Sequence, residues 1–181
     1  MNFYSEDTYG ERVAGVYDEW YSEFEPGAID MLAELAGGGK VLELGIGTGR
    51  IALPLSARGI EVHGIDAAAS MISRLRSKLG AEQLTVTQGN FAEVAVQQEF
   101  ALVYVVFNTF FALPSQEAQV ECFRNVAAHL SSEGCFLVEA FVPDLARFTG
   151  YRRSAKGYSE RRFAKTARAT LQCRSETMRS P

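Results

Sequence analysis

Three glycines at alternate positions mark the stretch of this sequence that is best suited to chemistry. Gly45, Gly47 and Gly49 directly follow the apolar run 41–44, and Ile51 opens a helical pattern. Glycine is favoured where the backbone takes a positive φ or lies flat against a ligand, because a Cβ atom would collide there. A strand, a glycine-rich turn and the start of a helix together form a corner that binds nucleotides. The stretch therefore predicts a nucleotide-binding site.

Other residue types that commonly carry catalysis are not grouped in this sequence. Cys122, Cys135 and Cys173 are far apart and form no C-x-x-C pair, which argues against a zinc site and against disulfides. His63 falls inside a predicted strand and His129 near the end of a predicted helix, so we interpret both as structural. We predict no bound metal and no Ser-His-Asp or Cys-His group. Reduced thiols of this kind indicate a cytoplasmic protein.

The elements that must position the glycine turn alternate between strands and helices. Apolar runs predict strands at about 40–45, 60–66, 84–87, 100–106 and 134–141. Helical spacing predicts helices at about 28–36, 49–58, 67–79 and 115–130. Strands that alternate with helices of this length pair in parallel through right-handed crossovers. The predicted fold is therefore a doubly wound α/β domain with a mainly parallel sheet.

The same spacing predicts which helical side chains are buried. In the 67–79 helix these are Met71, Ile72, Leu75 and Leu79. In the 115–130 helix they are Val120, Phe123, Val126, Ala127 and Leu130.

The spacing of the glycines distinguishes two kinds of nucleotide-binding corner. The dinucleotide fingerprint is G-x-G-x-x-G, whereas this sequence has Arg50 at the position of the third glycine. The compact pattern Glu43-x-Gly45-x-Gly47-x-Gly49 resembles motif I of class I S-adenosylmethionine-dependent methyltransferases. This resemblance implies a Rossmann-like methyltransferase fold, S-adenosylmethionine as cofactor and S-adenosylhomocysteine as its product.

Further segments resemble the same family in the same order, over about residues 9–145. Asp66 ends the second strand like the family acid that accepts hydrogen bonds from both ribose hydroxyls. Gly89-Asn90-Phe91 is similar to the Gly-Asp-apolar segment that holds the adenine, with Asn90 in place of the usual Asp. Phe107-Asn108 stand where the family meets the methionine end of the cofactor, and Ser132-Glu133-Gly134 is similar to its Pro-Gly-Gly turn.

The resemblance thus implies a set of cofactor-binding residues, in which the glycines admit the amino-acid part of the cofactor and the acid of motif I organises the turn. They are Glu43, Gly45, Gly47, Gly49, Asp66, Ala67, Met71, Asn90, Phe91, Phe107 and Asn108. Simpler interpretations stay open for three of them. Asp66 is alternatively a helix N-cap, and Asn90 and Asn108 are alternatively plain turn residues.

The first 25 residues or so are predicted to form an aromatic cap on the domain. Tyr9, Tyr17 and Tyr21 are candidates for closing the pocket, where aromatic faces would favour a cationic sulfonium. The alternative is an amphipathic helix that packs on the domain without touching a ligand. Residues 1–7 are acidic and lack the basic start of a signal peptide.

Residues 151–181 are predicted to form a basic tail that is separate from the methyltransferase domain at 1–150. The tail carries nine Lys and Arg against two Glu, whereas residues 1–150 carry nine basic and twenty acidic residues. Full family members continue with a hairpin of strands six and seven, which is lacking or degenerate here. The tail is either a truncated or frame-altered end or the solvated surface of a natural short variant.

Without that hairpin the fifth strand would be an exposed apolar edge, which favours association. Either a homodimer through this edge or a tail strand near 167–173 would cover it. The acidic body argues against nucleic acid and against an anionic membrane as partners. No apolar run approaches the ~20 residues of a membrane span.

The predicted function is S-adenosylmethionine-dependent methyl transfer to a small-molecule acceptor by in-line displacement. The protein then supplies proximity, alignment and desolvation, so the lack of an evident general base is consistent with it. One alternative is a methyltransferase-like protein that binds the cofactor, or pairs with another subunit, without turnover. A less favoured alternative is an NAD-dependent oxidoreductase, against which the glycine spacing counts.

Overall fold

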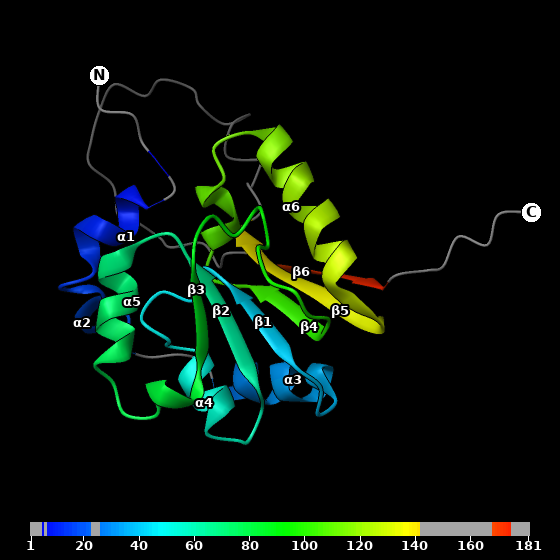
Figure 1. Cartoon of the computed structure of the whole chain (residues 1–181), viewed down its shortest axis with the longest axis horizontal. Coiled ribbons are helices and arrows are strands. Elements are labelled where there is room, and N and C mark those ends of the chain that lie inside the picture. Colours follow the sequence, from blue (N-terminus) through cyan, green and yellow to red (C-terminus); the bar gives the residue numbers. More distant parts are fainter. Residues whose placement is uncertain (1–4, 6, 23–25, 142–167, 175–181) are drawn as a thin grey trace, which may run out of the picture.

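The chain, described here by a computed structural model, forms a six-stranded sheet with helices on both faces (Figure 1). The structure describes residues 5, 7–22, 26–141 and 168–174. The helices are α1 (Thr8–Val13), α2 (Tyr17–Trp20), α3 (Pro26–Ala36), α4 (Ala52–Ser56), α5 (Ala69–Arg76) and α6 (Gln116–His129). The strands are β1 (Val41–Leu44), β2 (Val62–Asp66), β3 (Thr85–Gln88), β4 (Phe100–Val105), β5 (Leu130–Phe141) and β6 (Arg168–Arg174). Short 3-10 turns lie at Ala81–Gln83 and Thr109–Ala112.

The sheet has the order β3-β2-β1-β4-β5-β6. The pairs among β1 to β5 are all parallel, and β6 runs antiparallel to β5. The prediction of a doubly wound, mainly parallel sheet is confirmed. Because β1 has β2 on one side and β4 on the other, the winding direction reverses beside β1. Ligands of such sheets bind at this point, beyond the carboxyl ends of the strands.

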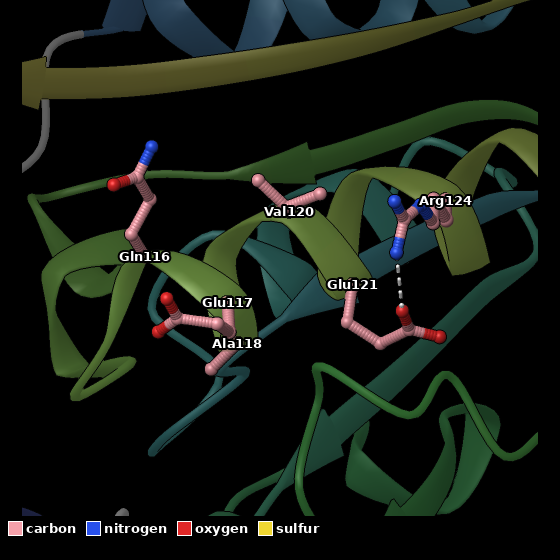
Figure 2. Close-up of a pocket in the computed structure, with 6 residues that line it drawn as sticks. All are labelled: Gln116, Glu117, Ala118, Val120, Glu121 and Arg124. Atoms are coloured by element: carbon pink, nitrogen blue, oxygen red, sulfur yellow. Dashed lines mark hydrogen bonds and ion pairs between the residues drawn. The ribbon is translucent and has the colours of Figure 1, made fainter.

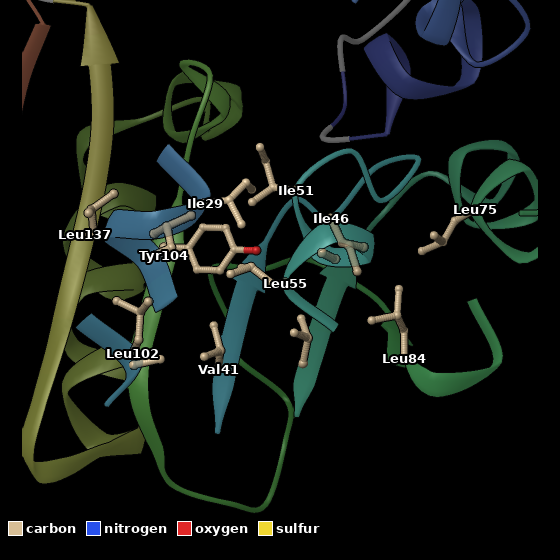
Figure 3. Packing of buried hydrophobic residues seen from close by; sticks show 14 of the residues in the cluster. Ile29, Val41, Ile46, Ile51, Leu55, Leu75, Leu84, Leu102, Tyr104 and Leu137 are labelled. Atoms are coloured by element: carbon tan, nitrogen blue, oxygen red, sulfur yellow. The ribbon is translucent and has the colours of Figure 1, made fainter. Parts of the chain in front are cut away.

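Both faces of the sheet are buried, which explains why the strands are apolar runs rather than alternating patterns. One face of the central strands, including Val41 and Tyr104, packs on α3, α4 and α5 (Figure 3). The other face, including Leu42 and Val103, packs on α6 and on the loops after β3 and β4. Figure 3 shows the Tyr104 ring among Ile29 and Leu55. The 100–106 segment accordingly forms a strand, β4, in the middle of the sheet.

Some helical side chains predicted to be buried are exposed instead. Helix α5 ends at Arg76, so Leu79 lies in the following turn, where it is 96% exposed. In α6 the buried positions are Cys122 and Val126, one turn apart. The helix is therefore rotated relative to the predicted face. The exposed or only partly buried positions of that face are Val120, Phe123, Ala127 and Leu130.

The outer edge of β5 is covered by the chain itself. β6 pairs along β5 from Phe141↔Arg168 to Cys135↔Arg174, which matches the second of the two arrangements predicted for this edge. The homodimer through the edge stays a prediction. Apart from β6, the predicted basic tail lies outside the described residues. β5 also starts earlier than predicted, and its register shifts against β4, so the 132–134 turn becomes an irregularity within the strand.

Both histidines are engaged in internal hydrogen bonds, as their structural interpretation requires. The His63 ring lies 2.8 Å from Thr87 Oγ1 and 3.0 Å from Gln98 Nε2. The His129 ring nitrogens face two backbone carbonyl oxygens at 2.6 and 2.9 Å. Burial lowers the pKa of His63, which favours its neutral ring. Within the described part of the chain, no cluster of metal-ligating side chains is found and no helix is long and apolar enough to span a membrane.

Candidate cofactor site

The three glycines of the turn after β1 all have positive φ, at 74°, 54° and 79°, but each meets a different neighbour. A Cβ atom at Gly45 would overlap the Thr109 side chain, and one at Gly49 would overlap Leu75. At Gly47 a Cβ would meet nothing within 4 Å. Only Gly47 therefore presents bare backbone to open space, whereas Gly45 and Gly49 allow neighbouring elements to pack closely.

Asp66 joins the end of β2 to the glycine turn. Its carboxylate accepts hydrogen bonds from the backbone N–H of Gly47, at 2.7 Å, and of Ala68, at 2.9 Å. Burial raises the pKa of the Asp66 carboxyl, against the effect of these two hydrogen bonds. Asp66 therefore orders the loop that leads into α5, and the same carboxylate lies beside the one glycine of the turn that faces open space.

Glu43 lies behind the turn and is buried in the sheet. Its carboxyl group accepts a 2.8 Å hydrogen bond from the hydroxyl of Tyr104 on the neighbouring strand β4. Burial raises the pKa of Glu43 to about 8, although the Tyr104 hydrogen bond and the charge of Arg50 oppose the shift. A buried carboxyl is costly to ionise, so burial keeps a largely protonated acid at the base of the turn.

A cavity of about 90 Å³ lies above the glycine turn. Its walls come from the cap, the turn after β1, the end of β2 with α5, and the loops after β3 and β4. The predicted site residues that line it are Tyr9, Tyr17, Gly45, Gly47, Asp66, Ala67, Met71 and Phe91. Four more residues line the cavity without having been predicted from the sequence, namely Gly10, Ala68, Thr109 and Ala112.

A second hollow, of about 480 Å³, adjoins the cavity through the shared residue Ala67. It is also lined by Gln88, Gly89 and Asn90, the segment that resembles the adenine-binding part of the family. Asn90 Oδ1 accepts a 2.9 Å hydrogen bond from the Ala92 N–H, as expected of a turn residue. Asn90 therefore acts as a turn residue, as its simpler interpretation predicted, and it also lines the hollow.

Phe107 and Asn108 form a tight turn after β4 and do not line the cavity. Both are in the left-handed region, at φ 59° and 63°, which is uncommon for non-glycine residues and typical of functional sites. Glu139 of β5 accepts a 3.1 Å hydrogen bond from the Phe107 N–H, and Asn108 Oδ1 accepts one of 2.6 Å from the N–H of Phe141. The turn is therefore fixed to the end of β5.

Replacing Asn108 by alanine is expected to destabilise the fold by about 2 kcal/mol, because it removes the Phe141 hydrogen bond and leaves a Cβ residue in the left-handed region. Asn108→Gly, which restores backbone freedom without the side chain, should recover about half of that loss. Urea denaturation of the two variants provides the measurement. Equal losses for both variants would contradict the backbone part of this explanation.

The aromatic residues of the cap reach the site in two ways. Tyr9 and Tyr17 line the cavity directly. Tyr21 lies further out, with its ring 4.9 Å from that of Tyr17 and 4.9 Å from that of Phe107. The guanidinium of Arg50 lies over the Phe107 ring, 4.4 Å from its centroid. The cap is made of two short helices, α1 and α2, rather than one.

A polar cluster that the sequence analysis missed fixes the cap to the site. Asp18 of α2 accepts hydrogen bonds from Thr48 of the glycine turn, from Arg74 of α5 and from Lys78 in the turn that follows α5. Asp18 is separated from these partners by 30 to 60 positions in the sequence. The only signal in one sequence is that their charges are opposite, which is too common to point to a contact.

A larger hollow, of about 630 Å³, lies on the outer side of α6, away from the glycine turn (Figure 2). Two of its charged side chains, Glu121 and Arg124, form a 3.2 Å ion pair with each other on the exposed surface. It contains none of the residues predicted to bind a cofactor. We therefore take the smaller cavity at the end of β1 and β2 as the candidate site.

The fold and the glycine corner are those of Rossmann-like methyltransferases, and comparison with known proteins agrees. A family described as methyltransferase domain matches residues 41–134, which cover β1 to the irregularity in β5. The chain belongs to this family. The match includes every predicted cofactor-binding residue, whereas the cap and β6 lie outside it.

Individual relatives are also methyltransferases. The chain is 29% identical over 152 residues to a cypemycin N-terminal methyltransferase from Streptomyces sp, covering 81% of this chain and 62% of the relative. It is 37% identical to the solved CcbJ methyltransferase from Streptomyces caelestis, with a TM-score of 0.72 over 77% of this chain and 60% of that one. The glycopeptide N-methyltransferase MtfA, solved with S-adenosylmethionine, shares the fold at 22% identity, with a TM-score of 0.60 over 79% and 57%. The chain thus spans about three fifths of the length of these proteins.

Proposed function

We propose that this chain binds S-adenosylmethionine above its glycine turn and transfers the methyl group to a small-molecule acceptor by in-line displacement. The observation that carries the proposal is the pairing of Asp66 with Gly47. A half-buried carboxylate at the end of β2 lies beside bare backbone at the reversal point of a parallel sheet. A carboxylate of this kind suits a ribose diol, and the bare backbone admits a ligand at close range.

The residues present fit such a group along the two adjoining hollows. Asp66 would hold the ribose, and Asn90 and Gln88 would face the adenine across the open hollow. Tyr9, Tyr17 and Met71 would enclose the remainder of the cofactor. When bound, the sulfonium supplies an activated methyl group for attack by the acceptor.

The chain's own contribution is then alignment and exclusion of water. The cap tyrosines and Phe91 present apolar and aromatic surface to the cavity, which strengthens electrostatic interactions there and favours a cation. Methyl transfer from a sulfonium does not require a dedicated general base, because the leaving group is already activated. An acceptor whose nucleophile is neutral at working pH would suit this site.

Transfer of a labelled methyl group tests the proposal directly. The chain is incubated with methyl-labelled S-adenosylmethionine and a crude extract of bacterial small metabolites, and labelled products are separated. We expect labelled small molecules that are absent when the Asp66→Asn variant is used. Binding of the cofactor without any labelled product would instead support the alternative of a binding protein without turnover. The alternative of an NAD-dependent oxidoreductase has no support from the family to which the chain belongs.

A further inference from the structure

The cap lies along α5 and is attached to it at both ends. At one end Gly10 packs so tightly on Ala68 that a Cβ atom would be 2.5 Å from the Ala68 Cβ, and Glu11 accepts a 3.1 Å hydrogen bond from the N–H of Ser70. Between the ends, Ala14 packs with Ala68 and Met71 in a small apolar cluster. Figure 1 shows α1 and α2 beside α5, at the same end of the sheet.

The other attachment is the Asp18 cluster, which involves three elements at once. Asp18 Oδ1 accepts from Thr48 Oγ1 at 2.6 Å and from Lys78 Nζ at 2.8 Å, and its Oδ2 accepts from Arg74 Nε at 2.9 Å. Lys78 Nζ also donates to the Thr48 backbone oxygen at 2.8 Å. Although burial opposes ionisation, these hydrogen bonds lower the pKa of Asp18 to about 2. The side chains are still 26% to 38% exposed, so water can replace their contacts.

The cap in this position leaves too little room for the part of the cofactor that it would cover. The cavity beneath Tyr9, Gly10 and Tyr17 has about 90 Å³, much less than the adjoining hollow of about 480 Å³ and less than the roughly 300–1,000 Å³ of common small-molecule and cofactor sites. The floor of the cavity is the sheet edge and the glycine turn, which are tied into β2 by Gly45 and Ile46. The cap is the wall that is joined to the rest through side chains, so it is the part that has to move.

We propose that Asp18 is a latch that holds α2 over the cavity and whose release admits the cofactor. The latch joins the moving cap to the fixed side of the site, because Thr48 belongs to the glycine turn, Arg74 to α5 and Lys78 to the turn that follows α5. This inference rests on the proposed function for the identity of the ligand. It makes Asp18 a positioning residue, since it does not line the cavity itself.

A latch has a kinetic signature that a loss of structure does not have. Because the latched cap leaves too little room beneath it, the Asp18 contacts compete with the cofactor, so weakening them raises the association rate constant and lowers Kd. Charge-assisted hydrogen bonds of partly exposed groups make the increase in the association rate constant about tenfold, with Kd lowered by a similar factor. A merely structural role would weaken binding without accelerating association.

The chain contains a single tryptophan, Trp20, which lies at the end of α2 and reports on the cap without any ligand. Fluorescence anisotropy of Trp20 is compared in the cofactor-free wild type, Asp18→Asn, Lys78→Met and the control Glu19→Gln, which changes a neighbouring exposed acid on α2. Stopped-flow binding of S-adenosylhomocysteine to the same four proteins gives the rate constants.

We expect lower Trp20 anisotropy, about tenfold faster association and a correspondingly lower Kd in Asp18→Asn and Lys78→Met, with Glu19→Gln unchanged. Unchanged anisotropy, or association that is no faster than in wild type, overturns the latch. If wild-type protein binds no S-adenosylhomocysteine, the proposed function fails. The anisotropy measured without ligand then still supports or overturns the attachment of the cap by Asp18.

Discussion

Glu43→Gln is expected to make the protein markedly more resistant to urea than wild type at pH 9, with little difference at pH 5. The reason is the buried Glu43 carboxyl, whose pKa is raised to about 8 by burial. A neutral acid suits its surroundings, in which Tyr104 donates one hydrogen bond to it. Glutamine has the same shape, accepts the same hydrogen bond and never ionises.

The sign follows from the difference between the folded and unfolded states. The unfolded chain releases the Glu43 proton near its ordinary pKa of 4.5, whereas the folded chain retains it up to about pH 8. The contribution of the protonated group to stability is therefore complete below pH 4.5 and is lost as pH rises through that window. The loss is about 1.4 kcal/mol per pH unit, or roughly 3–5 kcal/mol in all.

Urea unfolding of wild type and Glu43→Gln at pH 5, 7 and 9 measures this difference. The exposed Glu34 of α3 provides the control, because Glu34→Gln removes a carboxylate that is in water in both states. The gap between Glu43→Gln and wild type should widen with pH, and the gap for Glu34→Gln should not. Parallel curves for wild type and Glu43→Gln would show that Glu43 is ionised in the folded protein.

Gly49→Ala is expected to lower the free energy of unfolding by about 2–5 kcal/mol. A residue with a Cβ atom at φ 79° costs about 1–2 kcal/mol, and overlap with Leu75 and Leu53 in the core adds about 1–3 kcal/mol. Leu75 is fully buried and cannot move aside cheaply. The substitution therefore separates α5 from the glycine turn as well as straining the turn.

Gly59 is the matched control for this prediction. Its φ of 82° is nearly that of Gly49, but a Cβ atom there would meet nothing within 4 Å. Gly59→Ala should therefore cost only the conformational part, about 1–2 kcal/mol. Thermal or urea unfolding of both variants gives the comparison. Equal losses would mean that the contact with Leu75 contributes nothing and that backbone strain explains the whole effect.

The sequence predicted those features of the fold and the site that depend on residues close together in the chain. The glycine spacing, the acid at the end of β2 and the order of strands and helices are local patterns, and they predicted the sheet and most of the cavity wall. Gly49 shows the limit of such a pattern, because its glycine is required by Leu75, a residue 26 positions away, and not by the cavity. The spacing alone could not separate these two reasons.

The features that were missed depend on contacts between distant parts of the chain. Nothing near Asp18 indicates that Arg74 and Lys78 will meet it, and nothing near Glu43 indicates a hydroxyl donor from β4. Leu79 was misplaced for a different reason, because α5 ends before the apolar spacing does. The spacing of apolar residues predicts which side chains a helix buries only as far as the helix itself extends.

Calorimetric titration with S-adenosylhomocysteine tests the central claim most directly, with S-adenosylmethionine and NAD(H) titrated alongside. The proteins are wild type, Asp66→Asn and the control Asp30→Asn, which changes an exposed acid that pairs with Arg58. We predict saturable binding of the two sulfur ligands to wild type and Asp30→Asn, weakened about tenfold or more in Asp66→Asn, and none of NAD(H). A folded chain that binds neither sulfur ligand, or binds them equally well in Asp66→Asn, would contradict the assignment of this cavity.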